Sequence, residues 1–453
     1  MNEIVKTVLK KIIPEYILQR RRKQIKNKRF LKEIMDGFRI TRLEPLTFVE
    51  YKKMEELHKK YKNMCVCFLP VNVIAMFCLT FYHFFDKVKK KDDCYSLFVK
   101  QFNTEERKYN LPNDVLYKMF CRRFEEINKQ NINFWCVYFK KYLLDVEVYL
   151  PEDEHDFEVR CSKAYYLCNR QHFRRSAEVR LAFTQQEKME GFSKLKNMGV
   201  GKKFVCFFSR DNAYYRKNFK QGIIKTETLS LLAKYRNSDI KQYYQMTEWL
   251  IENGLWSVRM GECVEHGYQC TGSVDYSNTV NQSAFMDVFL IAHCCFFIGD
   301  LSGVVEIAKM FFKPVVLINV SVVFIELDAS VKADLMIFRR FCKNEKVLSL
   351  KDILQLQKAA LGKYSKGNGA MNFWQYLSEN NVKTILNTAE EICEVAKEMT
   401  SIINGTIQYS KEDIVLQEKY RNCIADNWPD KKVNAVCGRV GSKWLRDNKW
   451  FLE

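Results

Sequence analysis

KFVCFFSRDN (203–212) and CCFFIGDLSG (294–303) each contain an apolar run that stops at polar and small residues. LWSV (255–258) and PVVLIN (314–319) are further apolar runs of the same stretch, and amphipathic helical segments separate the runs. Runs that are apolar on both faces indicate strands of a parallel sheet that helices cover on both sides. The stretch therefore predicts an α/β domain, and the rest of the chain is interpreted around it.

The ends of these runs carry residues that suit a phosphate-bearing ligand. In chain order they are Arg210 and Asp211, then Arg259, then Gly299, Ser302 and Gly303. Ligands of parallel sheets bind at the carboxyl ends of the strands. Arginine pairs bidentately with phosphate, and a helix start offers free backbone N–H groups. The pattern predicts a diphosphate site, and its alternatives are ordinary ion pairs for the arginines and a plain turn capped by Ser302.

Positive charge is concentrated at the N-terminus. The 453 residues, enough for two or three domains, include 73 Lys and Arg against 54 Asp and Glu, a net charge of +19. Residues 1–32 hold eleven of the basic residues and two Glu, with apolar residues at helical spacing over 4–13 and the run RRRKQIKNKR at 20–29. This pattern predicts contact with an anionic membrane surface. The alternative is a solvated basic helix that packs on its own domain.

Cysteine usage and one uncharged segment bear on the compartment. None of the seventeen cysteines forms a CxxC pair, which indicates free thiols in a reducing cytoplasm and no metal site. Residues 64–85 carry no charge and approach the length of a membrane span. Pro70 and Asn72 interrupt them, so a strand, a loop and a buried helix are the favoured interpretation.

The first half of the chain predicts a less regular α/β domain. Strands are expected at 64–69 and 94–99, a helix at 116–127, and a strand or a buried helix at 133–139. A polar helix over 181–197 would link it to the second domain. Thr184 and Glu187 have the spacing of a capping box there.

Several familiar sites are absent from the sequence. It contains no GxxxxGK[ST], no GxGxxG and no HExxH, which argues against P-loop, standard dinucleotide and zinc-protease chemistry. The six histidines are scattered along the sequence and are expected to be structural. His266, in a predicted loop, is the best candidate among them for a catalytic role. Asp275, Tyr276 and Asp287 lie near the predicted ligand site. Their alternatives are loop solvation and, for Asp287, a position on a helix surface.

Joined motifs over residues 181–400 resemble a group of bacterial glycosyltransferases. In order, the motifs are R-D-x-A-Y at 210–214, R-N-x-D-I-x-x-Y at 236–243, R-M-G at 259–261, D-Y at 275–276, S-G at 302–303 and N-T-x-E-E-I at 387–392. The resemblance is weaker over 40–180 and absent from the first 35 residues. It implies a GT-B fold, in which two Rossmann-like domains with parallel sheets face each other across a cleft.

The resemblance also implies roles for the strand-end residues. The Arg-Asp pair looks like the arginine motif of fucosyltransferases, so Arg210, with Asp211, would stabilise the leaving diphosphate. Arg259 and the Ser302–Gly303 backbone would assist. Asp275 and Tyr276 would line the donor pocket beside Gly299. Where many members carry Gly-His, this chain has Ala75-Met76, so the catalytic base is unassigned.

The predicted organisation has four parts. They are a basic amphipathic segment (1–35), a first Rossmann-like domain for the acceptor (36–183), a second for the nucleotide sugar, with the linker helix (184–400), and a helical tail that packs back on the first domain (401–453).

The prediction is a cytoplasmic, membrane-peripheral glycosyltransferase that works without a metal ion. It would move a sugar from a nucleotide-diphosphate donor, with a GDP-sugar favoured, to a surface glycan or a lipid-linked acceptor. It has no other cofactor and binds no nucleic acid. The rival hypotheses are a nucleic-acid-binding protein, suggested by the net charge and the basic, aromatic tail, and a non-catalytic sugar-nucleotide binder.

Overall fold

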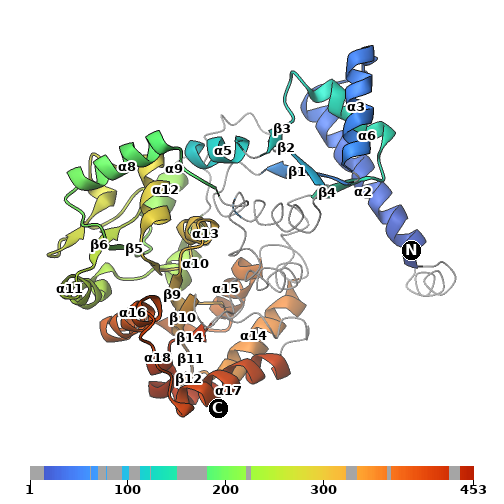
Figure 1. Ribbon diagram of the computed structural model, residues 1–453. Coiled ribbons are helices and arrows are strands. Elements are labelled where there is room, and N and C mark those ends of the chain that lie inside the picture. The colour runs from blue at the N-terminus through green and yellow to red at the C-terminus, as the bar shows by residue number, and fades with distance from the viewer. Residues whose placement is uncertain are drawn as a thin grey trace. The chain divides into compact units, whose positions relative to one another are not determined.

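The computed structural model divides the chain into two compact units, Met1–Glu152 and Asp153–Glu453. It describes residues 15–61, 63–69, 78, 94–100, 113–122, 124–149, 181–220, 226–322, 334–364, 369–427 and 439–453. Figure 1 shows the helices and strands of both units. The described residues do not include the predicted amphipathic segment 4–13, most of 64–85, or the Ala75-Met76 pair.

The first unit contains a parallel sheet in the order β3-β2-β1-β4. Its strands are Asn63–Leu69 (β1), Cys94–Lys100 (β2), Glu125–Glu126 (β3) and Val146–Tyr149 (β4). Its helices are Glu15–Gly37 (α2), Phe48–Lys60 (α3), Asp114–Cys121 (α5) and Ile132–Lys141 (α6). The predicted strands over 64–69 and 94–99 are confirmed. The helix expected over 116–127 ends earlier, because β3 pairs with β2.

The ambiguous segment 133–139 is a buried helix. Its Trp135 is 1% exposed and belongs to a core that includes Phe30 and Ile34 of α2. Asn27 of α2 donates to the carbonyl oxygens of Leu143 and Val146, at 2.6 and 2.7 Å. The described part of the basic N-terminal segment is therefore fixed to this unit by one helix face, while its basic side chains lie largely exposed.

The second unit is built on a seven-stranded sheet in the order β14-β10-β9-β8-β5-β6-β7, in which every neighbouring pair is parallel. Its strands are Phe204–Phe208 (β5), Trp256–Arg259 (β6), Ser273–Val274 (β7), Phe297–Gly299 (β8), Val315–Val320 (β9), Asp334–Phe338 (β10) and Arg439–Val440 (β14). The central strands β8 and β9 are buried along their whole length. The predicted α/β fold with two parallel sheets is confirmed. That the two domains face each other across a cleft stays a prediction.

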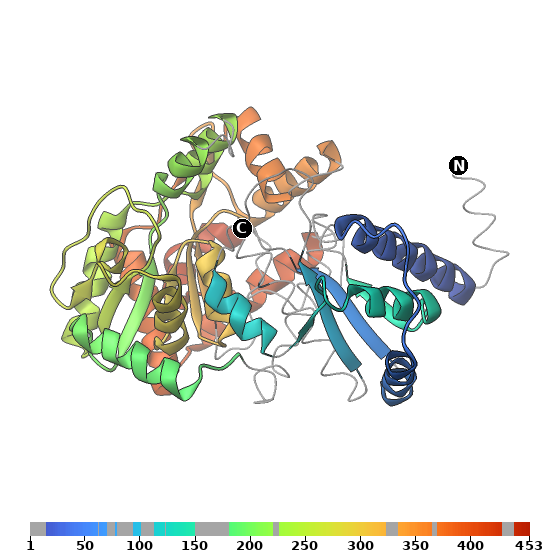
Figure 2. The ribbon, with the colours of Figure 1, turned by 90° about the horizontal axis from the view of Figure 1, so that it is seen from above.

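Helices cover both faces of this sheet (Figures 1 and 2). One group comprises Gln185–Asn197 (α8), Ala284–His293 (α12) and Gly303–Met310 (α13), and the other comprises Tyr244–Glu252 (α11) and Ala389–Asn404 (α16). The predicted capping box of Thr184 and Glu187 starts α8, and Thr388 and Glu391 form another at α16. These caps satisfy backbone N–H groups that a helix start leaves free.

Further helices surround the sheet's β14 edge and the chain between β5 and β6. They are Ala213–Lys220 (α9), Thr226–Arg236 (α10), Leu350–Lys363 (α14), Gly369–Glu379 (α15), Lys411–Asn427 (α17) and Ser442–Asp447 (α18), with short 3-10 turns at Ile240–Tyr243 (η5), Tyr276–Asn278 (η6) and Lys449–Leu452 (η8). A small antiparallel sheet is formed by Arg340–Lys343 (β11), Lys346–Val347 (β12) and Lys383–Ile385 (β13).

The described part of the C-terminal tail packs within the second unit, and its packing back on the first domain stays a prediction. Its strand β14 pairs with β10, and α17 and α18 pack on α14 and α16. The cause is the unpaired edge that β10 would otherwise present, because an exposed strand edge carries free N–H and C=O groups.

No helix in the described part of the chain is both long and apolar enough to span a bilayer.

Gly299 ends β8, and we predict that a methyl group there is not tolerated. A Cβ at this position would lie 2.3 Å from the Phe208 carbonyl oxygen of the neighbouring strand. Backbone cannot rotate away as a side chain can, so Gly299→Ala should lower the free energy of unfolding by about 1–3 kcal/mol.

The matched control is Gly362→Ala on the exposed end of α14, where a Cβ meets nothing within 4 Å. It should raise stability by about 0.5–1 kcal/mol through helix propensity. Urea denaturation followed by circular dichroism measures both variants. Equal effects at the two positions would contradict this packing role of Gly299.

Candidate functional site

A buried carboxylate organises the carboxyl ends of the central strands. Asp300 directly follows β8 and is 2% exposed. Its Oδ2 atom accepts from the Arg210 backbone N–H at 2.9 Å, from the Tyr243 hydroxyl at 3.3 Å and from the Ser238 hydroxyl. Its Oδ1 atom accepts from Asn319 Nδ2 at 3.1 Å. One side chain thus connects the ends of β5, β8 and β9 to the loop before η5.

Burial and hydrogen bonding act in opposite directions on the Asp300 carboxyl, and the net shift of its pKa is upward. Burial raises the pKa of Asp300, and the hydrogen bonds from Ser238 and from the Arg210 N–H, with the nearby Arg339 guanidinium, oppose that rise. A buried carboxylate with four donors and a cation beside it is stable only while all of them stay in place.

A pair of asparagines extends the network to α16. The Asn319 N–H donates to Asn387 Oδ1 at 2.7 Å, and the Asn387 N–H donates to Asn319 Oδ1 at 2.8 Å. Asn387 Nδ2 also donates to the Phe338 carbonyl oxygen at 2.9 Å. The N-T-x-E-E-I motif therefore begins where β9 and β10 end.

Arg210 and the Ser302 segment are brought together, as the sequence predicts. Arg210 is 8% exposed, and its Nη1 donates to the Leu301 carbonyl oxygen at 2.8 Å. Arg236, at the end of α10, donates to the same carbonyl at 2.9 Å. Both guanidinium groups also donate to the Tyr215 hydroxyl. Two arginines thus lie against the loop that precedes α13.

Arg339 is a third arginine of the site, and the sequence interpretation did not identify it. It follows β10, is 2% exposed, and donates to the carbonyl oxygens of Asn319 at 3.0 Å and Asn237 at 3.3 Å. The signal was available, because two arginines follow the apolar run DLMIF (334–338) in the same way that Arg210 follows its strand. Arg236 was identified only as the first residue of the R-N-x-D-I-x-x-Y motif and was given no role in the site.

The arginine cluster, defined as Arg210, Arg236 and Arg339, holds more positive charge than its surroundings balance. Burial lowers the pKa of Arg210, and it lowers the pKa values of Arg236 and Arg339 to about 10. Asp300 is the carboxylate that opposes the shift for all three. Asp211 also opposes it for Arg210, but Asp211 pairs with Arg259 as well. The cluster therefore still favours an additional anion.

The start of α13 adds uncommitted donors. Ser302 is the N-cap residue of α13, yet its hydroxyl makes no capping hydrogen bond. Ser302 Oγ and Arg210 Nε are both buried, and neither has a hydrogen-bond partner among the described residues. The positive end of a helix beside unpartnered donors is suited to phosphate oxygens.

Arg259 occupies a different environment from the one predicted. It is 1% exposed, with its guanidinium nitrogens 3.9 Å from Asp211 Oδ2 and 3.6 Å from Asp275 Oδ2. Its Nη1 donates to the His266 carbonyl oxygen at 2.5 Å. Two carboxylates therefore balance its charge, and the predicted help of Arg259 in binding the diphosphate stays a prediction.

The two carboxylates beside Arg259 are similarly occupied. Asp211 Oδ1 accepts from the Ala213 N–H at 2.9 Å, where α9 begins, and its Oδ2 accepts from the Glu265 N–H at 2.8 Å. Asp275 Oδ2 accepts from the Tyr268 N–H at 2.8 Å. They fix the loop after β6, and the predicted place of Asp275 in the donor pocket stays a prediction.

Tyr276 is a core residue and does not line an open site. It is 0% exposed, its hydroxyl donates to the Ser283 carbonyl oxygen at 3.1 Å, and it accepts from the Ser283 N–H at 2.9 Å. The predicted site residues thus form two groups. One group lies near the start of α13 and consists of Arg210, Gly299, Ser302 and Gly303. In the other, Arg259 lies beside Asp211 and Asp275, and Tyr276 follows Asp275 in the chain.

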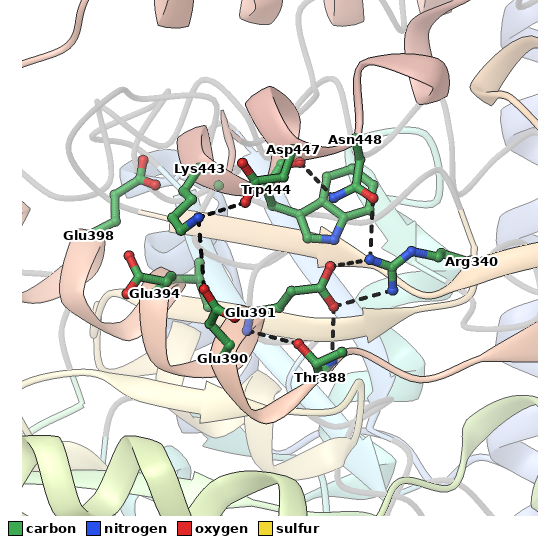
Figure 3. A pocket seen from close by; sticks show the side chains of 12 residues that line it. Arg340, Thr388, Glu390, Glu391, Glu394, Glu398, Lys443, Trp444, Asp447 and Asn448 are labelled. Carbon is green, nitrogen blue, oxygen red and sulfur yellow. Dashed lines mark hydrogen bonds and ion pairs between the residues drawn. The ribbon is translucent and has the colours of Figure 1, made fainter.

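A cavity of about 220 Å³ lies elsewhere in the second unit, between α16 and α18. Figure 3 shows Arg340 paired with Glu391 and Asn448, and Lys443 paired with Asp447. Glu390, Glu394 and Glu398 also line the cavity. Because carboxylates outnumber cations in its lining, the cavity does not have the electrostatic character of the arginine cluster.

We predict that Asp300→Asn destabilises the fold by at least about 2 kcal/mol, because an amide presents N–H to groups that are themselves donors. Asn319 cannot turn to accept, since its Oδ1 already accepts from Asn387. The control is Asp447→Asn, at a carboxylate that is 54% exposed and pairs with Lys443; it should cost less than about 1 kcal/mol. Chemical denaturation compares the two, and an equally small loss would refute the anchoring role.

Asp287 provides a pH-dependent prediction. Burial raises its pKa from 3.8 to about 6. The folded protein therefore binds this proton more tightly than the unfolded chain, so the stability contribution is complete below pH 4 and disappears as the pH rises to 6. Asp287→Asn stays neutral and should gain up to about 3 kcal/mol over wild type between pH 4 and pH 7. Urea midpoints at several pH values measure the difference, and a constant difference would contradict the prediction.

No protein-family model matches the chain, and no curated protein matches its sequence. Three of the solved structures to which it is similar are as follows. A glycosyl transferase family 9 protein from Veillonella parvula aligns at 10% identity over 74% of this chain and 98% of its own, with a TM-score of 0.36. The ADP-heptose lipopolysaccharide heptosyltransferase II of E. coli aligns at 11% identity over 62% and 92%, with a TM-score of 0.32. The wall teichoic acid polymerase TagF aligns at 8% identity over 88% and 100%, with a TM-score of 0.26. Identities and TM-scores this low say nothing about the chemistry of the site.

Proposed function

We propose that this protein is a metal-independent glycosyltransferase that transfers a sugar from a nucleotide-diphosphate donor, with a GDP-sugar favoured. The observation that carries the proposal is that Arg210 and Arg236 both donate to the Leu301 carbonyl just before α13, beside the buried and unpartnered Arg210 Nε and Ser302 Oγ atoms. A diphosphate would supply the missing negative charge. The resemblance of motifs 210–392 to bacterial glycosyltransferases supports the same assignment.

The chemistry requires charge stabilisation at the leaving group. When the bond from the sugar to the diphosphate breaks, negative charge grows on the diphosphate oxygen. Arginines and helix-start N–H groups fixed in a buried site can stabilise this charge without reorganising. Arg210 would contact the diphosphate directly through its uncommitted Nε, and the Ser302 hydroxyl and the Gly303 N–H would complete the site.

The acceptor is proposed to be a surface glycan or a lipid-linked sugar at the inner face of the cytoplasmic membrane. Helix α2 supports this placement, because its outer face carries exposed Arg20, Arg21, Lys28 and Arg29 around Ile25, which is 61% exposed. Basic side chains around an exposed apolar residue are typical of helices that lie on anionic lipid. The remainder of the predicted membrane-binding segment, residues 1–14, precedes this helix.

Arg210→Lys tests the proposal, since it keeps the charge but removes the planar fork that binds two phosphate oxygens. We expect turnover of the donor to fall by at least about 100-fold, as for the loss of a preorganised donor to a developing anion. The assay uses the full chain with EDTA present. Lys419→Ala is the control, because it removes a positive charge from the exposed face of α17 and should leave turnover unchanged.

The donor is identified by thermal shift against GDP-, UDP-, dTDP-, ADP- and CMP-sugars, because a ligand of the folded state raises its stability. A diphosphate donor should raise the melting temperature of wild type more than that of Arg210→Lys, and CMP-sugars, with one phosphate, should act weakly. Equal shifts in the two proteins, or turnover that survives in Arg210→Lys, would overturn the proposal.

A further inference from the structure

Tyr215 contacts two members of the arginine cluster, Arg210 and Arg236, although no sequence motif singled it out. It lies in the first turn of α9. That helix begins at Ala213, whose N–H donates to the Asp211 carboxylate. The Tyr215 hydroxyl accepts from Arg210 Nη2 and from Arg236 Nη1, the latter at 3.3 Å. The Arg210 guanidinium also lies over its ring, 5.0 Å from the ring centroid.

These contacts determine what the hydroxyl can still do. A phenol oxygen has acceptor capacity for two donors and one proton of its own to donate. Both acceptor positions are used by guanidinium groups, which have no acceptor capacity in return. Among the described residues, no acceptor for the Tyr215 proton is found. The free donor therefore lies beside Arg210 and Arg236, in the region of excess positive charge.

We propose that Tyr215 donates its hydroxyl hydrogen bond to the diphosphate of the bound donor and stabilises the leaving oxygen. The proposal rests on the proposed function. It adds the neutral Tyr215 hydroxyl to the guanidinium groups and to the donors at the start of α13. The two arginines orient the phenol, because each occupies a lone pair and leaves one direction for the O–H bond. Tyr215 would thus contact the reacting part of the substrate, with Arg210 and Arg236 holding it in place.

In the step itself, the bond between the anomeric carbon and the diphosphate oxygen breaks, and its electron pair moves to that oxygen. The acceptor hydroxyl oxygen forms the new bond to the carbon, and its proton passes to water. Tyr215 keeps its proton throughout. Its hydrogen bond strengthens as charge grows on the leaving oxygen, so it lowers the barrier more than it tightens ground-state binding.

The position of α9 does not depend on the phenol. Arg216 pairs with Glu265 at 3.1 Å, and Lys217 pairs with Glu262 at 2.7 Å, so the helix is joined to the loop after β6. Asp211 joins the same loop through the Glu265 N–H. Replacing Tyr215 by Phe should therefore remove one hydroxyl and leave the helix in place, which makes the substitution a clean probe.

The experiment compares Tyr215→Phe with Tyr51→Phe. Tyr51 belongs to the first unit, is 42% exposed, and its hydroxyl likewise accepts from a cation, Lys141 Nζ, at 2.7 Å. Isothermal titration of the full chain with inorganic pyrophosphate should show affinity about 10-fold lower in Tyr215→Phe, as for the loss of a hydrogen bond to a charged group. With the donor identified by thermal shift, kcat should fall by about 10- to 100-fold and KM should change by less than 3-fold in either direction. Tyr51→Phe should match wild type in both measurements.

A purely structural role would lower the melting temperature of Tyr215→Phe but leave its pyrophosphate affinity and kcat unchanged, and that result would overturn the inference. Wild type that does not bind pyrophosphate would overturn it as well. Pyrophosphate binding that depends on Tyr215, without turnover of any sugar nucleotide, would support the inference and defeat the proposed glycosyltransferase reaction. The two failures are thereby distinguishable.

Discussion

The Asp300 carboxylate is the interaction on which the site of the second unit depends. It is 2% exposed and accepts hydrogen bonds from Arg210, Ser238, Tyr243 and Asn319. The donors come from different strand ends and loops, so one buried charge fixes their relative positions. A buried carboxylate is costly unless it is fully satisfied, and this requirement makes the arrangement specific. The same negative charge allows three arginines to approach one another.

The excess of positive charge around that carboxylate links the fold to the chemistry. Burial that lowers the pKa values of Arg236 and Arg339 to about 10 indicates that the free protein holds these charges at a cost. An anionic ligand would relieve this cost, so binding energy is available for a diphosphate. Because the groups are held by the sheet and by α10, little reorganisation is needed as charge develops on a leaving group. Tyr215 and Ser302 would add neutral donors to the charged ones.

The sequence predicted the architecture and part of the site, for reasons that individual residues make clear. Apolar runs identified the central strands, and the rule that ligands lie at strand ends placed Arg210 and Ser302 together. The same rule did not anticipate the partners of Arg259, because it cannot show that Asp211 and Asp275 both lie beside its guanidinium. It could have identified Arg339, which follows a strand of the same kind. Asp300 was quoted within its motif, but its four donors come from distant segments and no local pattern specifies them.

The most direct test of the central claim is a crystal structure of the full chain with bound nucleoside diphosphate. The account predicts diphosphate density at the start of α13, within hydrogen-bond distance of Arg210 and of the Gly303 N–H. Density for the diphosphate at any other place on the chain, with Arg210 still bound only to Leu301 and Tyr215, would contradict it.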